Sequence, residues 1–212
     1  MSSQTPFEHV PTYLFGHTPA NEESLIAAAV SLYESGNASL IVMDGGGLYT
    51  PPTSSSGKVV AYSGGDDWRD QLVHRGVPEK NIVFMDSPRP TLSHTGTDAE
   101  RFVRFAKSRD WKVVSVVAIP PQLLRAFAIT VRCLERDYPE LLVYSQPGNP
   151  LPWDQPSAMA QGVSCATLLG DGIDTEWDRI NRVYGNAYDP VTAEQAIAYI
   201  KRRDEKARKM GL

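Results

Sequence analysis

The sequence contains only two cysteines, Cys133 and Cys165, and only four histidines among its 212 residues. So few cysteines exclude a disulfide-stapled secreted scaffold and fit a reducing compartment, although one disulfide between them stays geometrically open. No run reaches the roughly 18 apolar residues that span a bilayer. The first residues, MSSQTPFEHVP, lack a charged segment followed by an apolar one, so we expect neither a signal peptide nor a membrane partner. Basic residues number 21 and acidic residues 25, and this net charge of −4 gives no electrostatic reason to expect nucleic acid.

The remaining composition, 42% hydrophobic and 22% charged, is that of a soluble globular domain. At roughly 150 residues per domain, the chain supplies one core with about 60 residues to spare. Between residues 10 and 145, short β-rich apolar runs alternate with amphipathic stretches of helix length, which is typical of βαβ units. The pattern predicts strands over 11–15, 39–43, 82–85, 113–119 and 141–144, and helices over 22–35, 67–75, 97–108 and 122–137. The expected fold class is α/β, a Rossmann-like three-layer sandwich with a mainly parallel five-stranded sheet.

The character of the chain changes after Gln146, where the stretch PGNPLPWDQPSAMAQGVS is rich in proline and glycine. Two helical patterns follow, near 175–184 and 193–209. This part has few large aliphatic side chains and would make a poor independent core. We therefore expect an α/β domain over residues 10–145 and a C-terminal helical extension over residues 146–212 that packs on it.

Functional side chains are expected directly after the strands, because ligands of open α/β sheets bind outside the strand carboxyl ends, where the strand order reverses. Asp44 and three glycines follow the second strand. The glycines let a ligand approach the backbone closely, and Asp44 is a candidate base, although a plain flexible turn explains the glycines equally well. The candidate catalytic residues are Asp44 and His94, and the candidate ligand-binding residues are Gly16, Gly45, Gly46, Gly47, Thr95, Asp98, Gln122 and Arg125.

The third predicted helix opens with hydroxyls and free backbone N–H groups, which favour an anion. His94 lies there as a candidate acid, with a surface histidine of no special role as the alternative. The spacing Thr97-x-x-Glu100 also predicts a capping box that needs no ligand. No local metal-binding motif occurs, although His17 and His94 could meet at the strand ends.

The fourth predicted helix begins near Pro121 and places Gln122 and Arg125 one turn apart on nearly the same face. An arginine at this position can hold a phosphate or a carboxylate through two parallel hydrogen bonds. The alternative is that Arg125 pairs with an aspartate or glutamate on a neighbouring loop.

The order and spacing of several motifs resemble a known family. The family has the motif ALYxxG, then a strand and SGG, and this is similar to SLYESG at 31–36 followed by LIVMDGGG. The family also has L-x-x-x-GVP, then a strand and NTxENA, and this is similar to residues 72–78 followed by NIVFMD and HTGTDA. QLLRA at 122–126 is similar to HMxRA. On these motifs, residues 10–145 resemble a divergent member of the DUF218 family of YdcF-, SanA- and ElyC-like proteins.

The resemblance implies a Rossmann-like domain with a ligand pocket at the strand carboxyl ends. The family's activity is poorly defined, and S-adenosylmethionine is the cofactor suggested for one branch. The chain departs from the family pattern at three places. It has Gln122 where the family has His, and His94 where the family has Asn. Residues 63–65 stand where the family has a SEA motif with its Glu. An acid–base role of those family residues is therefore not inherited, although His94 or Asp66 can substitute.

Three functional hypotheses follow. The first is a cytoplasmic protein that binds a nucleotide-like or phosphorylated small molecule at the strand carboxyl ends, with S-adenosylmethionine as one such ligand. The second is a non-catalytic interaction module in which residues 146–212 cover a vestigial pocket. The third is a homodimer built through the C-terminal helix.

Overall fold

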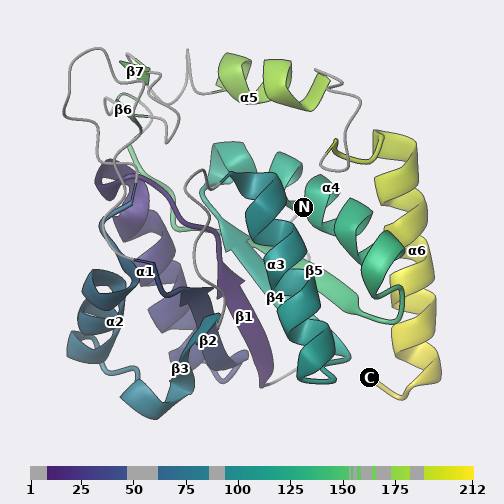
Figure 1. The fold of residues 1–212 in the computed structure, drawn as a ribbon, viewed down its shortest axis with the longest axis horizontal. Coiled ribbons are helices and arrows are strands. Elements are labelled where there is room, and N and C mark those ends of the chain that lie inside the picture. The colour runs from purple at the N-terminus through teal and green to yellow at the C-terminus, as the bar shows by residue number, and fades with distance from the viewer. Residues whose placement is uncertain are drawn as a thin grey trace.

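The computed structural model describes residues 9–46, 62–85, 94–152, 154, 157–158, 164–165, 173–181 and 189–212. Its main sheet has five strands, β1 (Val10–Leu14), β2 (Ala38–Asp44), β3 (Ile82–Met85), β4 (Val113–Ala118) and β5 (Leu142–Pro147). All neighbouring strands are parallel and follow the order β3-β2-β1-β4-β5 (Figure 1). The predicted Rossmann-like α/β class is confirmed, and the sheet is entirely parallel.

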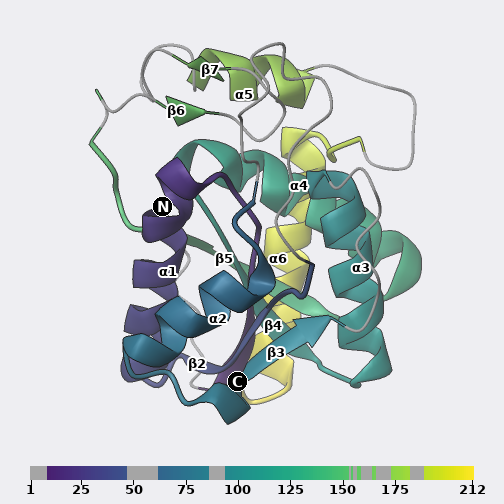
Figure 2. The same cartoon turned by 60° about the vertical axis from the view of Figure 1, so that its left-hand side comes forward.

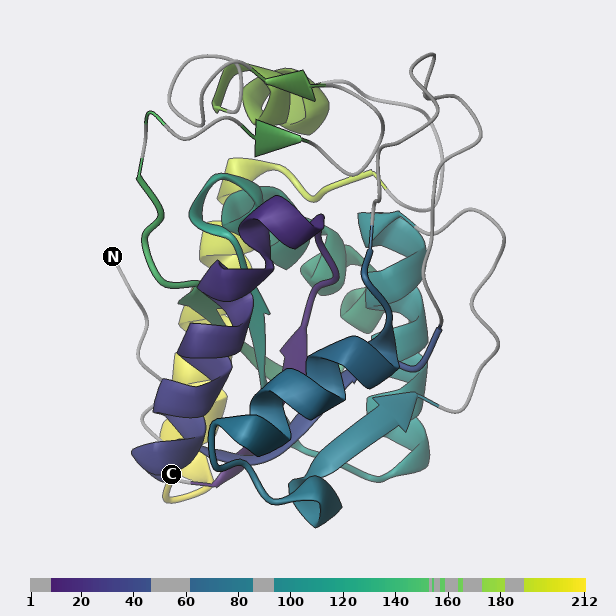
Figure 3. The same cartoon turned by 90° about the vertical axis from the view of Figure 1, so that its left-hand side faces the viewer.

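Helices cover both faces of this sheet and give the molecule three layers (Figure 3). The helices α1 (Pro19–Glu34) and α2 (Gly65–His74) pack on one face. The helices α3 (Thr95–Ser108) and α4 (Pro120–Asp137) pack on the other, and a short 3₁₀ turn, η1 (Glu79–Asn81), leads into β3. Among the described residues, no helix combines the length and apolar character that crossing a membrane requires.

The central strands contribute side chains to two separate cores. In β1, Tyr13 belongs to the core under α3 and α4, whereas Leu14 belongs to the core under α1 and α2. In β2, Val42 and Met43 divide in the same way. Successive side chains of a strand point to opposite faces, and both faces here are covered. This double burial explains why the predicted strands read as continuous apolar runs.

The chain after β5 crosses over the carboxyl ends of the strands. Gly148 N donates to Ala118 O at 2.8 Å, and Ser24 Oγ donates to Asn149 O at 2.6 Å. A Cβ on Gly148 would lie only 2.3 Å from Ser24 Oγ, so a larger residue here would displace the Ser24 hydroxyl from its hydrogen bond to Asn149 O. The strands β6 (Ser157–Ala158) and β7 (Ser164–Cys165) and the helix α5 (Ile173–Asn181) then lie above the sheet (Figure 2).

The last helix, α6 (Ala193–Lys209), has the bounds that the sequence predicts and packs beside α4 and β5 (Figure 1). Its side chains pair with the backbone of β5, an outer strand of the sheet. Tyr199 Oη accepts the N–H of Val143 at 2.8 Å, and Arg203 Nη1 donates to Val143 O at 3.1 Å. The predicted C-terminal helix is therefore present, and it packs on the edge of the sheet.

Candidate functional site

The strand order reverses between β1 and β4, which are neighbours in the sheet although β2 and β3 come between them in sequence. Residues 15–18 and 119–122 leave the sheet at this point, and Phe15 N donates to Val117 O at 2.9 Å. Gly16 lies here and is half-buried. Open α/β sheets bind their ligands at such a switch point because the flanking connections diverge and leave a crevice.

Three predicted ligand-binding residues meet beside this switch point. Gln122 Nε2 and Arg125 Nη1, both on the first turns of α4, donate to Oγ1 of Thr95 at 3.1 and 2.7 Å. Thr95 is the first residue of α3, so two helix beginnings are joined by one hydroxyl. All three side chains are buried. The sequence prediction that these positions share one site is consistent with this geometry.

The remaining edge of the Arg125 guanidinium forms an ion pair with α5. Its Nε and Nη2 donate to Oε2 and Oε1 of Glu176 at 2.5 and 3.0 Å. Arg179 Nη1 donates to Oε1 of the same carboxylate at 2.7 Å. The exposed fractions of the Arg125, Glu176 and Arg179 side chains are only 11%, 3% and 15%. Arg125 therefore does pair with an acidic residue, the alternative left open by the sequence, and the acid comes from α5.

Sequence reasoning missed Glu176 and Arg179. Both lie in the predicted helix 175–184, which the structure places at Ile173–Asn181. Their spacing resembles that of an ordinary exposed ion pair, and Asp178 between them is exposed. Only the packing of α5 on α4 buries this particular glutamate, so no local sequence signal distinguishes it.

His17 lies at the same switch point and is buried. Its Nδ1 accepts the backbone N–H of Thr18 at 2.9 Å and faces Asn21 Nδ2 at 3.1 Å. Burial lowers the pKa of His17 to about 4, with Arg125 and Arg179 adding to the effect and Glu176 opposing it. The imidazole is therefore neutral near pH 7, and because Nδ1 is an acceptor, the proton resides on Nε2.

His94 is the N-cap of α3, which begins at Thr95 and not at residue 97. Its Nδ1 accepts the N–H groups of Gly96 at 3.1 Å and Thr97 at 3.4 Å, while Thr97 Oγ1 accepts the N–H of His94 at 3.0 Å. The predicted Thr97–Glu100 capping box is therefore wrong, because the imidazole one turn earlier already satisfies the donors of the first turn. Burial, and then Arg125, lower the pKa of His94. Because Nδ1 accepts hydrogen bonds from the backbone, the proton of the neutral imidazole resides on Nε2.

Asp44 belongs to a second cluster, at the end of β2. Its Oδ1 accepts a hydrogen bond from Arg101 Nη1 at 2.6 Å, and its carbonyl accepts one from Tyr62 Oη at 2.8 Å. Asp98 is buried on α3 nearby, since Asp44 and Asp98 both act, after burial, to raise the pKa of Tyr13. The candidate base Asp44 thus faces Arg101 in an ion pair.

The glycines after Asp44 approach the beginning of α2. Gly65 N donates to Gly46 O at 2.8 Å, and a Cβ on Gly65 would lie 2.4 Å from Asp44 O. A Cβ on Gly45 would lie 3.1 Å from Phe84 Cβ. Close packing between these backbones therefore already gives Gly45 and Gly46 a structural role. Gly47 lies outside the described residues.

Thr95, Gln122 and Arg125 form a group that we call the switch-point cluster. One buried polar atom of this cluster has no hydrogen-bond partner within the described part of the chain. Gln122 is 5% exposed, its Nε2 donates to Thr95, and its Oε1 is unpaired. A buried amide oxygen without a partner costs about 1–3 kcal/mol. Such an atom marks a place where a ligand donor would be stabilised.

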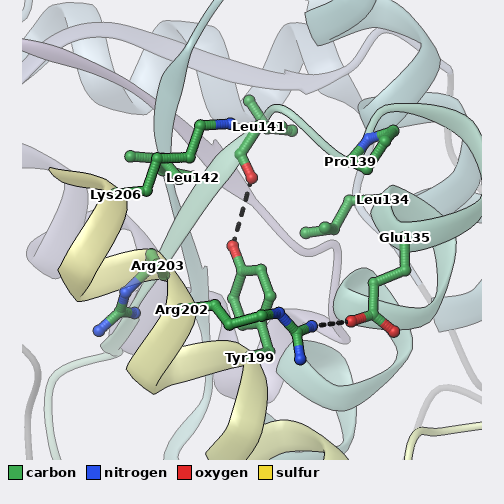
Figure 4. Close-up of a pocket in the computed structure, with 9 residues that line it drawn as sticks. All are labelled: Leu134, Glu135, Pro139, Leu141, Leu142, Tyr199, Arg202, Arg203 and Lys206. Carbon is green, nitrogen blue, oxygen red and sulfur yellow. Dashed lines mark hydrogen bonds and ion pairs between the residues drawn. The ribbon is translucent and has the colours of Figure 1, made fainter. Parts of the chain in front are cut away.

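A separate cavity of about 440 Å³ lies between α6, the end of α4 and the start of β5, as Figure 4 shows. Leu134, Leu141 and Leu142 form its apolar wall. Its polar residues already have partners in the protein: Arg202 with Glu135, and Tyr199 with the backbone of Val143. This cavity is therefore explained by the packing of α6, and the switch-point cluster is the stronger candidate site.

Comparison with known proteins adds no assignment. No protein-family model matches the chain, and no curated protein matches its sequence. The class that the fold defines, a Rossmann-like α/β protein, thus stands on the strand order and layers alone.

Proposed function

We propose that this protein binds a small molecule with an anionic group at the switch point between β1 and β4, and that it acts in the cytoplasm. The observation that supports this proposal is the buried group of Arg125, Thr95 and Gln122, which joins the beginnings of α3 and α4. The resemblance to the DUF218 family supports a pocket at this position. The free, buried thiol of Cys133 fits a reducing compartment.

Charge favours an anionic ligand. Among the residues that the structure describes here, two guanidiniums, of Arg125 and Arg179, share the carboxylate of Glu176, so these three side chains together carry one positive charge in excess. Neutral His17 beside it contributes no charge. A net charge buried in protein is costly, and an anion would compensate it. Nucleotide-like and phosphorylated metabolites, and the carboxylate of S-adenosylmethionine, are the ligands to test.

A thermal-shift panel tests this proposal, with adenosine 5′-monophosphate, ribose 5-phosphate and S-adenosylmethionine as probes. A ligand that binds only the folded state raises the free energy of unfolding by about 2.7 kcal/mol at a hundredfold excess over its Kd. We expect at least one probe to stabilise the wild-type protein. If none does, the proposed function is wrong.

The matched variant is the double substitution Arg125→Gln with Glu176→Gln, which removes both charges together and leaves no buried carboxylate unpaired. It should lose the ligand-dependent shift. The control is Arg104→Gln on α3, because the Arg104 side chain is 65% exposed and lies outside this cluster. A shift that survives the double substitution would place the ligand elsewhere.

The second candidate function is a non-catalytic interaction module. It is favoured by the ion pair itself, because Glu176 of α5 already occupies the bidentate edge of Arg125. On this hypothesis the extension closes a vestigial pocket, and no probe in the panel would shift the melting temperature of the wild-type protein or its variants.

A further inference from the structure

The carboxylate of Glu176 carries less charge than the two guanidiniums that it contacts. It accepts two hydrogen bonds from Arg125, at 2.5 and 3.0 Å, and one from Arg179 at 2.7 Å. The two guanidiniums together carry two positive charges, whereas the carboxylate carries one negative charge. The Glu176 side chain is only 3% exposed. A dianion between the same guanidiniums would balance the charge fully.

We propose that Glu176 occupies the position of a phosphoryl group, and that the ligand of this site is a phosphate monoester which displaces the Glu176 side chain and binds between Arg125 and Arg179. A phosphate monoester carries a charge of about −1.5 to −2 at pH 7 and has three acceptor oxygens. The planar guanidinium pairs with phosphate oxygens as it does with a carboxylate. This inference rests on the proposed function and names the ligand class for the same site.

The Oε1 atom of Gln122, which has no hydrogen-bond partner among the described residues, independently indicates a ligand at this site. It is buried, and Nε2 of the same amide donates to Thr95, the hydroxyl that Arg125 also contacts. A phosphate group has acceptors to offer but no donor at full charge, so the donor for Oε1 must come from the organic part of the ligand. A hydroxyl close to the phosphate ester, as in a sugar phosphate, supplies it.

The displacement gives α5 a defined role in binding. Arg179 lies one turn after Glu176, so the same helix that closes the site also contributes its second cation. A monocarboxylate ligand would leave the excess positive charge in place and gain nothing over Glu176. The site should therefore discriminate in favour of phosphate esters over carboxylates.

The test measures the affinity of ribose 5-phosphate by calorimetry for the wild-type protein and for Glu176→Gln. The glutamine keeps the shape of the side chain but removes the competing charge. We expect the affinity to increase by at least about tenfold, the effect of losing one charge-assisted competitor. The matched control is Glu100→Gln, since Glu100 also contacts two arginines, Arg104 at 2.8 Å and Arg136 at 2.6 Å, away from this site. This control should leave the affinity unchanged.

A second variant keeps the inference testable if Glu176→Gln does not fold. Arg179→Gln removes the second cation from a partly exposed side chain and should weaken ribose 5-phosphate binding by about tenfold.

An unchanged affinity in Arg179→Gln, or an equal or weaker affinity in Glu176→Gln, overturns the displacement while the proposed function stands. If neither the wild-type protein nor Glu176→Gln binds ribose 5-phosphate, the displacement is wrong whatever the function. Adenosine 5′-monophosphate or S-adenosylmethionine binding in the panel would then show that the proposed function survives.

Discussion

His17 illustrates how a single buried side chain couples the switch point to pH. Its Nδ1 accepts a backbone N–H, and protonation there would place a positive charge against a donor in a buried site next to two arginines. The neutral form is therefore strongly preferred in the folded protein. In the unfolded chain the same imidazole titrates near its ordinary pKa of about 6.5.

The free energy of unfolding should fall on acidification. Between pH 6.5 and about 4 the unfolded chain binds a proton at His17 and the folded protein does not, so stability rises with pH across this window. The pKa difference corresponds to about 3 kcal/mol, lost progressively as the pH falls from 6.5 towards 4. Urea unfolding at pH 7, 5.5 and 4.5 measures it.

The variant His17→Gln should reduce this acid dependence, whereas His74→Gln, at an exposed position of α2, should not. Equal acid slopes in His17→Gln and the wild-type protein would show that His17 does not carry the effect.

At the scale of elements, the edge of β5 depends on α6. Edge strands present unpaired backbone groups that invite pairing with another chain, and natural proteins cover them. Here Tyr199 and Arg203 of α6 satisfy both polar groups of Val143. The Arg203 guanidinium also lies 3.9 Å from the ring centroid of Tyr144, so its charge has a partner next to the strand.

Tyr199→Phe should destabilise the protein by about 1–3 kcal/mol, because it leaves the buried N–H of Val143 without an acceptor. Tyr33→Phe is the control, since Tyr33 on α1 is only partly buried. Both variants remove one hydroxyl, and denaturant midpoints at constant slope compare them. A loss in Tyr199→Phe no larger than in Tyr33→Phe would contradict this account of the edge.

At the scale of the whole molecule, the C-terminal extension is attached to the α/β domain at several separate places. Gly148 and Asn149 contact β4 and α1 through Ala118 and Ser24, Glu176 binds Arg125, and α6 packs on α4 and β5. The extension therefore contributes both to the site and to the integrity of the sheet.

A chain ending at Asp189 lacks α6 and should self-associate, because the β5 edge and the apolar surface under Tyr199 become exposed. Light scattering should report a larger mass than that of the full-length chain. The homodimer hypothesis predicts the opposite: a full-length dimer that becomes a monomer when α6 is removed. A monomeric, stable truncated chain would therefore contradict the protective role of α6.

Several of these features could be predicted from the sequence because their signals are local. The apolar runs set the strands, and the bounds of α6 follow from its periodicity and its Thr192 cap. The sequence could also group Thr95, Gln122 and Arg125, because the carboxyl ends of parallel strands lie at the same edge of the sheet. The N-cap of α3 was misplaced by a turn, because histidine is not a usual cap and its contact depends on a rotamer.

What the sequence determined by itself is the α/β class, the positions of the strands of the main sheet and the order of strands and helices along the chain. These follow from periodicity and from helix and turn chemistry, which act over a few residues. The tertiary structure alone decided the strand order, the partner of Asp44 and the burial of Glu176 between Arg125 and Arg179. Those outcomes depend on contacts between segments far apart in the chain. Such contacts form only when the layers pack, so no local sequence pattern indicates them.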